Sequence, residues 1–427
     1  MFNKKTVRDI DLKGKTVLVR ADYNVPIEKG HITDDYRIKQ SLDTIHYLLG
    51  QDCKIIICSH LGRPEGKPNP ELSLFPVAKK LKDILDKDVE FVPDCIGDQA
   101  SKAAANLKPG HILLLENLRF HPEEEANDDN FAATLASLAE IFVQDAFGVV
   151  HRAHASTEAI TKHLPSVAGL LLEREVDTIT RAIREPKRPL MAIIGGAKIA
   201  DKLDILKRFI EIADIVAIGG AMANTFLAAE NYYIGESLYD KQDLELAKSI
   251  LNSAKGESHK RPFVLTLPFD AVVTKAVDPK LPTRIVDWSA HAIADIENYP
   301  KRPPKESAHV HQDEMILDIG PFSGAFIAGS VQLANTVIWN GTMGVTETAG
   351  LQGAIGPYSH GTDLIIQALT GDMGHKPYTV VGGGDTVGYV ESRKLVPMFD
   401  LVSTGGGASL ELMSGHTLPG VEALLNQ

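Results

Sequence analysis

The sequence predicts an α/β protein with two doubly wound parallel-sheet, Rossmann-like domains joined by a helix. Its 427 residues exceed what one hydrophobic core normally organises, so two domains are expected. Short β-branched runs recur along the chain, each bounded by turn residues and followed by a helical stretch, as in parallel α/β sheets. One amphipathic segment separates these runs into two sets, and this segment marks the division between the domains.

The expected strands of the first set occupy residues 15–20, 54–59, 111–116 and 140–145, and those of the second occupy 189–194, 214–219, 262–267, 315–319, 336–340, 378–383 and 400–404. Between them, Leu172, Val176, Ile179 and Ile183 follow helical spacing, and two prolines end the pattern. We therefore expect an N-terminal domain at 1–170, a linker helix at 171–188 and a C-terminal domain at 189–404. Residues 405–427 should form a hinge turn and a segment returning toward the first domain.

Composition excludes several classes of protein. No segment approaches the roughly 20 apolar residues of a membrane span, and the first residues show no export signal, so a cytoplasmic protein is expected. The net charge of -12 argues against a nucleic-acid partner. Cys53 and Cys58 lie in one expected strand, and we interpret them as buried thiols rather than metal ligands.

Cationic and polar side chains follow the strands of the first half. Ligands of open α/β sheets collect beyond the carboxyl ends of the strands, so these positions predict a site. Arginine suits it because its planar fork makes paired hydrogen bonds to carboxylate and phosphate. The first half is therefore expected to bind a small ligand carrying phosphate, carboxylate or both, through Arg20, Asp22, Asn24, Arg37, His60, Arg63, Arg119, His151, Arg152 and His154.

Glycine-rich turns follow the strands of the second half, at 193–202, 217–226, 380–387 and 402–409. A glycine turn entering a helix exposes backbone N–H groups that hold phosphate. The alternative is that these glycines only permit tight packing of strand and helix. Asp385 is placed to meet Mg²⁺ carried by a nucleotide, and the spacing of Lys198 and Lys202 predicts that they share one helix face.

Other enzyme signatures are absent or weak. The GKT at 14–16 has Asp9 where a P-loop needs its first glycine, and no HRD or DFG triplet of protein kinases occurs. Gly382, Gly384 and Gly388 imitate a dinucleotide fingerprint imperfectly. Residues 278–313 are rich in proline and charge and predict a surface insertion, in which His309 and His311 are solvated rather than metal-bound.

Taken together, VRADYNVP, SHLGRP, LENLRF, HRAHAS, GGAKIADK, WNGTMGV, GGGDTV, STGGGASLEL and LPGVEAL resemble the phosphoglycerate kinase family over nearly the whole chain. The resemblance implies a monomeric, hinge-closing glycolytic enzyme that transfers a phosphoryl group reversibly from 1,3-bisphosphoglycerate to ADP, with Mg²⁺, giving 3-phosphoglycerate and ATP. The chain departs from the family pattern at Phe322, Thr342 and Thr346 and in a longer insertion. The departures lie in the nucleotide half.

The resemblance also implies residue roles. The triose substrate would be bound by Asp22, Tyr23, Asn24, Arg37, His60, Leu61, Gly62, Arg63, Arg119 and Arg152. The nucleotide would be bound by Lys202, Glu347, Gly383, Gly384, Asp385 and Thr386, with Asp385 at the metal. The transferring group would meet Arg37, Lys198, Gly405, Gly406 and Gly407. Two other functions remain open at this stage: a nicotinamide-dependent oxidoreductase, suggested by the weak glycine pattern, and a non-catalytic nucleotide-binding module.

Overall fold

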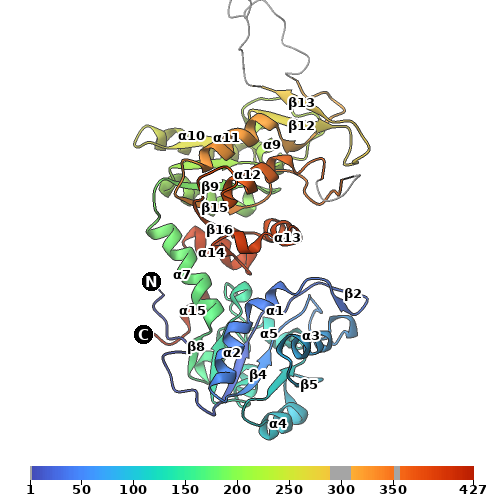
Figure 1. The fold of residues 1–427 in the computed structure, drawn as a ribbon, viewed down its shortest axis with the longest axis vertical. Helices are drawn as coiled ribbons and strands as arrows, with labels where there is room; N and C mark the ends of the chain where they lie inside the picture. Colours follow the sequence, from blue (N-terminus) through green and yellow to red (C-terminus); the bar gives the residue numbers. More distant parts are fainter. Residues whose placement is uncertain (1, 289–308, 351–355) are drawn as a thin grey trace, which may run out of the picture. The chain divides into compact units, whose positions relative to one another are not determined.

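The computed structural model describes residues 2–288, 309–350 and 356–427 and divides into two compact units (Figure 1). Unit 1 contains residues 1–180 and 404–427, and unit 2 contains residues 181–403. Within the described ranges, no helix combines the length and apolar character that crossing a membrane requires. The part of the expected insertion at 289–308 lies outside the described residues.

Unit 1 is built on a six-stranded parallel sheet with the order β5-β6-β4-β1-β7-β8. The strands are β1 (Thr16–Arg20), β4 (Lys54–Cys58), β5 (Val89–Val92), β6 (Ile112–Leu115), β7 (Ile141–Gln144) and β8 (Ser166–Ala168). Its main helices are α1 (Tyr36–Gln40), α2 (Leu42–Gly50), α3 (Phe75–Leu85), α4 (Gly97–Asn106), α5 (Pro122–Glu125) and α6 (Asp129–Ala136). Apolar clusters cover both faces of this sheet, which explains why its strands are almost uniformly hydrophobic.

Unit 2 contains a second six-stranded parallel sheet, with the order β11-β10-β9-β15-β16-β17. Its strands are β9 (Leu190–Ile194), β10 (Ile215–Ile218), β11 (Val264–Thr266), β15 (Thr336–Asn340), β16 (Tyr378–Gly382) and β17 (Leu401–Val402). Counted along the chain, this is the 3-2-1-4-5-6 order of doubly wound folds, with the strand order reversing between β9 and β15. The predicted fold class of two doubly wound parallel sheets is confirmed.

The helices of unit 2 connect these strands (Figure 1). They are α8 (Leu203–Ile212), α9 (Gly220–Ala229), α10 (Leu244–Ser258), α11 (Pro321–Val331), α12 (His360–Thr370) and α13 (Gly384–Ser392). One predicted strand belongs elsewhere: β14 (Met315–Ile319) pairs antiparallel with β12 (Asp270–Thr274), whose other neighbour is β13 (Arg284–Asp287). The sequence pattern located β14 but wrongly assigned it to a parallel sheet.

The short edge strands β5 and β8 and the hairpin of β2 (Ile27–Glu28) and β3 (His31–Ile32) were not predicted. β2, β3 and β5 together contain one buried residue and β8 has only three residues, so none of them shows a continuous apolar run. β13 lies inside the segment expected to be an irregular insertion, and it adds a regular strand there.

Helix α7 (Leu170–Arg184) lies where the sequence predicts an amphipathic helix, and the division between the units falls within it. Its first turn is held by buried Asp145, whose carboxylate accepts hydrogen bonds from the backbone of Leu171 and Leu172. Buried Glu175 of α7 accepts hydrogen bonds from Thr404 N at 2.7 Å and Thr404 Oγ1 at 2.9 Å. These contacts fix the start of the C-terminal segment within unit 1.

The C-terminal segment continues through α14 (Gly406–Ser414) and α15 (Pro419–Glu422). Lys5 N donates to Leu425 O, and Leu425 N donates to Ser166 O in β8. Lys4 Nζ donates to Glu422 O and Asn426 Oδ1. The two ends of the chain are therefore bonded to each other in unit 1 (Figure 1).

Candidate functional site

In unit 1 the polar groups that follow β1, β4, β6 and β7 lie at the carboxyl edge of one parallel sheet. The order of these strands, β6-β4-β1-β7, brings four loops together that are far apart in the sequence. Hydrogen bonds through Asn24, Gly62 and Arg119 connect three of these loops, those after β1, β4 and β6. The fold therefore gathers a large part of the predicted triose site into one polar network.

Arg37, in α1, is bonded to the loop that follows β1. Its Nη1 donates to Asn24 O at 3.0 Å and lies 3.3 Å from an Asp22 carboxylate oxygen. About a third of the Arg37 side chain remains exposed, whereas Asp22 is buried. Asn24 Oδ1 accepts a hydrogen bond from Gly62 N at 2.9 Å, which joins the loops after β1 and β4. Arg37 is thus oriented by neighbours while keeping part of its guanidinium available to a ligand.

Arg119 is positioned by Asn117, which lies in the same loop after β6. Asn117 Oδ1 accepts hydrogen bonds from Arg119 N and Leu61 N, and its Nδ2 donates to Leu61 O and Leu72 O. Arg119 Nη1 in turn donates to Gly62 O at 2.8 Å. Asn117 is a positioning residue that the sequence analysis did not single out. Its place in LENLRF, directly after a buried strand, was the available signal.

Two predicted ligand residues have side chains that do not face a ligand. Tyr23 is fully buried in the apolar core, where its hydroxyl lies 3.0 Å from Ser41 Oγ. Leu61 is also part of that core. Any contact of these residues with substrate has to use backbone atoms, which the sequence pattern alone could not reveal.

Arg20 differs from the other arginines because it is almost completely buried. Its Nε donates to Ser156 Oγ at 2.8 Å, and its Nη1 donates to Ala21 O at 2.5 Å. Glu124, itself buried, lies 4.0 Å from Arg20 and accepts hydrogen bonds from Ser156. The sequence pattern placed Arg20 among the predicted ligand cations. In the structure its side chain is buried and stabilises the loops from inside.

In contrast, Arg63 and Arg152 form no salt bridge with a carboxylate among the described residues. Arg63 is exposed, and Arg152 is half-buried, with its Nε donating to His151 Nε2 at 3.2 Å. A guanidinium without an acidic partner in an acidic protein favours an external anion. Both residues match the predicted anion site.

Three histidines in this region have pKa values below the ordinary value for an imidazole. Burial lowers the pKa of His60 well below its ordinary value, with Arg20 and Arg119 adding to the effect. Burial and the neighbouring arginines lower the pKa of His154 to about 4, and burial and Arg152 lower that of His151. The imidazoles are therefore neutral at pH 7, and the positive potential that opposes their protonation favours a bound anion.

The turn at Gly405–Gly407 belongs to unit 1. Gly405 precedes α14, and Gly406 and Gly407 form its first turn. A Cβ atom on Gly407 would lie 2.9 Å from His151 Nε2, and one on Gly405 would lie 2.9 Å from Gly148 Cα. The turn thus packs against the loop that carries His151 and Arg152, and the N–H groups at the start of α14 lie beside this loop.

Unit 2 contains a pocket at the carboxyl edge of its sheet, where the strand order reverses. Ligands of doubly wound sheets bind at such a point. Residues from the turns after β9, β10, β15 and β16 line it, including Gly196, Asn224, Thr342, Met343, Glu347 and Asp385. Most of the remaining lining is aliphatic or glycine, as in pockets that hold a flat organic ring.

The glycine turns of unit 2 divide into two kinds. A Cβ on Gly195 would lie 2.1 Å from Thr342 O, and one on Gly220 would lie 2.6 Å from Gly196 N. These glycines are required because backbone packs directly on backbone, which is the alternative considered for the glycine pairs. A Cβ on Gly384 would meet nothing within 4 Å. The turn before α13 therefore has the open space that a phosphate requires.

Lys202 ends a 3-10 helix, η5 (Ala200–Lys202), and points back toward the sheet. Its Nζ donates to Gly195 O at 2.5 Å, Asn340 O at 3.0 Å and Asn340 Oδ1 at 2.7 Å. Burial lowers its pKa to about 8, although Asp385 and Asp201 act in the opposite direction. Lys198 lies in the exposed loop before η5, so the prediction that both lysines share one helix face is wrong. The Gly196 turn keeps this stretch out of helical conformation.

The remaining nucleotide-side residues lie around the start of α13. Gly383 has a φ of 90°, a left-handed conformation that favours glycine, and precedes the helix. Asp385 is exposed in its first turn, while buried Thr386 accepts a hydrogen bond from Gly341 N at 2.7 Å. Thr386 therefore ties the helix to the loop after β15. Exposed Glu347 lines the same pocket.

The departures from the family pattern differ in their closeness to the pocket. Thr342 lines it, and its hydroxyl donates to Gly344 O at 3.1 Å. Phe322 lies in the first turn of α11 and packs edge-on against Phe269. Thr346 is half-buried in the loop after Val345, a residue of the lining. Thr342 is thus the substitution with direct access to a ligand.

Comparison with known proteins identifies the family. The family model for phosphoglycerate kinase matches residues 7–416. Phosphoglycerate kinases from Moorella thermoacetica and Chloroherpeton thalassium are 44% and 45% identical to this chain, over 99% and 100% of both lengths respectively. The structure of phosphoglycerate kinase from Coxiella burnetii is similar with a TM-score of 0.81, at 34% identity and covering 98% of both chains. That from Pyrococcus horikoshii gives 0.78 at 27% identity, covering 99% of this chain and 98% of the other.

Proposed function

Because the chain belongs to the phosphoglycerate kinase family, we propose that unit 1 binds 3-phosphoglycerate or 1,3-bisphosphoglycerate and that unit 2 binds the Mg-nucleotide. The enzyme is a phosphotransferase with a carboxyl group as acceptor, and its reaction is the reversible transfer of a phosphoryl group from 1,3-bisphosphoglycerate to ADP. The nicotinamide alternative is not supported. Its glycine pattern follows β16, whereas a dinucleotide fingerprint follows the first strand of the sheet, here β9.

The assignment of unit 1 is supported mainly by the group of arginines Arg37, Arg63, Arg119 and Arg152, called here the cationic cluster. In the proposal, Arg63, Arg119 and Arg152 bind the phosphate end of the triose, and Arg37 contacts the carboxyl end where the reaction occurs. Asp22 and Asn24 bind the hydroxyl and hold Arg37 in place. His60 stays neutral and donates a hydrogen bond without adding charge. The cluster thus recognises both anionic ends of a three-carbon acid phosphate.

In unit 2, the apolar lining of the pocket takes the base, and Lys202 and the N–H groups at Gly383–Thr386 take the phosphates. Glu347 binds the ribose, since a carboxylate accepts hydrogen bonds from its hydroxyl groups. Asp385 supplies a hard oxygen ligand beside the phosphate turn, which fits Mg²⁺ because this ion binds through one or two carboxylates together with substrate phosphates. When bound, Mg²⁺ neutralises charge on the phosphates.

The chemical step needs positioning and charge neutralisation rather than a general base. The attacking group is a carboxylate or a terminal phosphate, and both are anions at neutral pH. Arg37, Lys198 and the N–H groups of Gly405–Gly407 would stabilise the charge on the equatorial oxygens of the transferring group. This role agrees with a site that contains many cations and only neutral, low-pKa imidazoles.

A coupled assay with 3-phosphoglycerate and Mg-ATP tests the function, and calorimetry of each substrate separately tests the division of binding between the units. Arg152→Ala should weaken only triose binding, and Glu347→Ala only nucleotide binding. Turnover of hydroxy acids with a nicotinamide cofactor, or nucleotide binding without transfer, would favour the alternatives. As finer parts of the proposal, the enzyme is a cytoplasmic monomer without a nucleic-acid partner, and light scattering of the purified chain checks its mass.

A further inference from the structure

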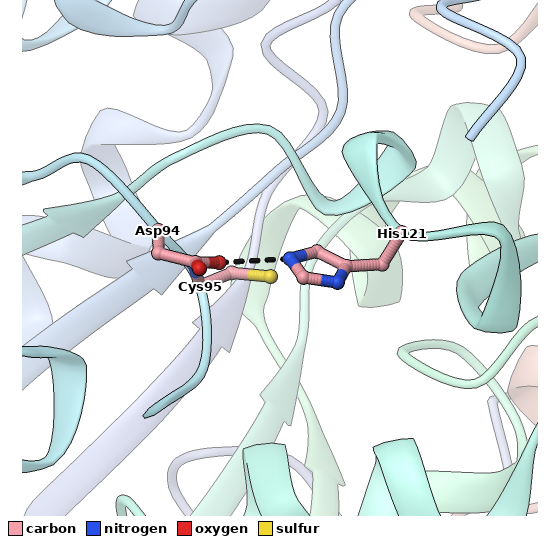
Figure 2. A group of neighbouring side chains, drawn as sticks. All are labelled: Asp94, Cys95 and His121. Carbon is pink, nitrogen blue, oxygen red and sulfur yellow. Dashed lines mark hydrogen bonds and ion pairs between the residues drawn. The ribbon is translucent and has the colours of Figure 1, made fainter. Parts of the chain in front are cut away.

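Three side chains of different chemistry meet in unit 1, outside the residues assigned to substrate. Asp94 and Cys95 follow β5, and His121 follows the 3-10 helix η2 (Leu118–Phe120), so distant parts of the sequence meet here. A carboxylate oxygen, the thiol sulfur and a ring nitrogen all lie within 4.8 Å of one another. Figure 2 shows the carboxylate and the thiol both directed toward the imidazole ring.

The present contacts of the three residues leave donor atoms for a ligand. His121 Nε2 lies 2.8 Å from Asp94 Oδ1, which also accepts hydrogen bonds from Cys95 N at 2.7 Å and Ile96 N at 3.4 Å (Figure 2). Within the described part of the chain, Asp94 Oδ2 has no hydrogen-bond donor, and the Cys95 sulfur makes no hydrogen bond to another residue. The hydrogen bond between His121 and Asp94 therefore orients the imidazole and the carboxylate without using all of their lone pairs.

The surroundings combine access with a negative potential. Asp94 is nearly half exposed and His121 about a quarter exposed, so an ion can enter from solvent, whereas Cys95 is buried. Burial, Asp94 and Glu124 raise the pKa of the Cys95 thiol, and the same negative charges attract a cation. Glu124 lies in α5, which follows His121 directly.

The donor set points to one class of ion. Zn²⁺ accepts sulfur, imidazole nitrogen and carboxylate oxygen in tetrahedral sites, and sites with three protein ligands keep a fourth position for water. A thiolate disfavours the hard ions Mg²⁺ and Ca²⁺, which prefer all-oxygen coordination. We propose that Asp94, Cys95 and His121 bind one Zn²⁺ ion, with water completing the coordination.

The other cysteines provide a contrast and a control. Cys53 is equally buried, but its sulfur donates a hydrogen bond to Leu12 O at 3.2 Å. Among the described residues, Cys53 does not lie in a group of three or more potential metal ligands. A serine at position 53 can keep that hydrogen bond. Cys53→Ser is therefore a matched control for the loss of one buried thiol.

Titration of the full chain with Cd²⁺ tests the site through the ultraviolet charge-transfer band of a cadmium–thiolate bond, and Co²⁺ gives a second spectrum that reports tetrahedral geometry. We expect saturation at one ion per chain, no thiolate band in Cys95→Ser and an unchanged band in Cys53→Ser. Zn²⁺ should displace Co²⁺. His121→Asn and Asp94→Asn should each weaken binding by about tenfold or more, as expected for loss of a ligand worth at least ~1.4 kcal/mol.

His121 and Asp94 are partly exposed, so their variants remain informative if Cys95→Ser does not fold, as judged by circular dichroism. The proposal is overturned by the absence of a thiolate band at equimolar metal. It is also overturned by a band that survives Cys95→Ser, or by metal affinity that is unchanged in a folded His121→Asn protein. None of these measurements uses phosphoryl transfer, so their outcome is independent of the proposed substrate sites.

Discussion

In the proposed assignment, the two units bind a phosphorylated ligand in opposite ways. Unit 1 would use side-chain cations, such as Arg63 and Arg152, on the loops beyond its sheet. Unit 2 would use backbone N–H groups at the start of α13 and one partly buried ammonium group, Lys202. Guanidinium groups recognise the planar geometry of carboxylate and phosphate, whereas a glycine turn lets the main chain approach closely. The difference suits a small, highly charged acid in one unit and a larger nucleotide with an apolar base in the other.

The same comparison shows that residue type alone does not identify a ligand group. Arg20 ends β1, at the edge where a ligand cation is expected, yet it is buried against Ser156 and Glu124. Gly195 and Gly220 resemble phosphate-turn glycines, yet their space is filled by neighbouring backbone. Each unit therefore contains residues of the expected type that pack inside the loops and others that are proposed to contact the ligand. Substitutions of residues proposed to contact the ligand, with surface residues as controls, test whether the two units bind phosphate in these different ways.

The largest effect is expected from Arg37→Ala. This change removes the cation proposed to meet the transferring group, so turnover should fall by roughly 10² to 10⁵ while the fold is retained. Arg8→Ala is the matched control, because Arg8 pairs with Glu173 on the surface of the same unit. Steady-state kinetics with a circular dichroism check measure the effect. Near-normal turnover in a folded Arg37→Ala protein would remove Arg37 from the reaction.

Gly406→Val should have the next largest effect. The side chain would keep the N–H groups of the first turn of α14 away from a phosphoryl oxygen, so kcat should fall by about 10² to 10³. Binding of each substrate alone, measured by calorimetry, should change little. Gly406→Ala should lower kcat less than Gly406→Val. If nucleotide affinity collapses together with kcat, the turn binds phosphate in the ground state and the assignment is wrong.

Asp385→Ala tests the metal-binding role proposed for Asp385 in unit 2. We expect the Mg²⁺ concentration for half-maximal activity to rise by roughly tenfold, equivalent to ~1.4 kcal/mol of binding. Triose binding should stay unchanged. The exposed Asp372 of the same unit supplies the control variant Asp372→Ala. An Mg²⁺ titration that superimposes on that of the unchanged protein would exclude Asp385 from metal binding.

Sequence patterns predicted the central strands well because those strands are buried on both faces. β15 was located to the residue, since an apolar run between turn residues leaves little choice. β14, an edge strand of the antiparallel sheet, was also located to the residue. The pairing partner of β14 could not be predicted, because strand direction depends on its contact with β12 rather than on local pattern. The edge strand β5 was missed because only one of its four residues is buried.

For the candidate sites, the sequence located the loops but not the direction of each side chain. Arg37 and Arg20 look equivalent as strand-end or loop cations, and only the fold shows that Ser156 and Glu124 surround Arg20. Lys198 and Lys202 have helical spacing, yet the Gly196 turn leaves only Lys202 in a helical conformation. The group formed by Asp94, Cys95 and His121 was invisible for the same reason, because its members meet only through tertiary structure.

The smallest expected effect concerns the protonation of Lys202. Its pKa of about 8 is below the ordinary value of 10.5 because burial disfavours the charged form. The folded protein therefore loses this proton at a lower pH than the unfolded chain does. The unfolded state therefore binds more protons between these values, and folding stability should increase as pH rises from about 8 toward 10.5.

Nucleotide binding should respond in the opposite sense, because phosphate favours the ammonium form. The bound fraction of that proton falls roughly fourfold between about pH 7 and about pH 8.5, and the nucleotide KM should rise by a similar factor. Lys202→Arg is the matched variant, since a guanidinium stays protonated over this range and its KM should be independent of pH. KM measured across the range for both proteins decides the point. A parallel rise of KM in Lys202→Arg would assign the pH dependence to another group. A constant KM in the unchanged protein would show that backbone N–H groups bind phosphate in unit 2 without the ammonium charge of Lys202.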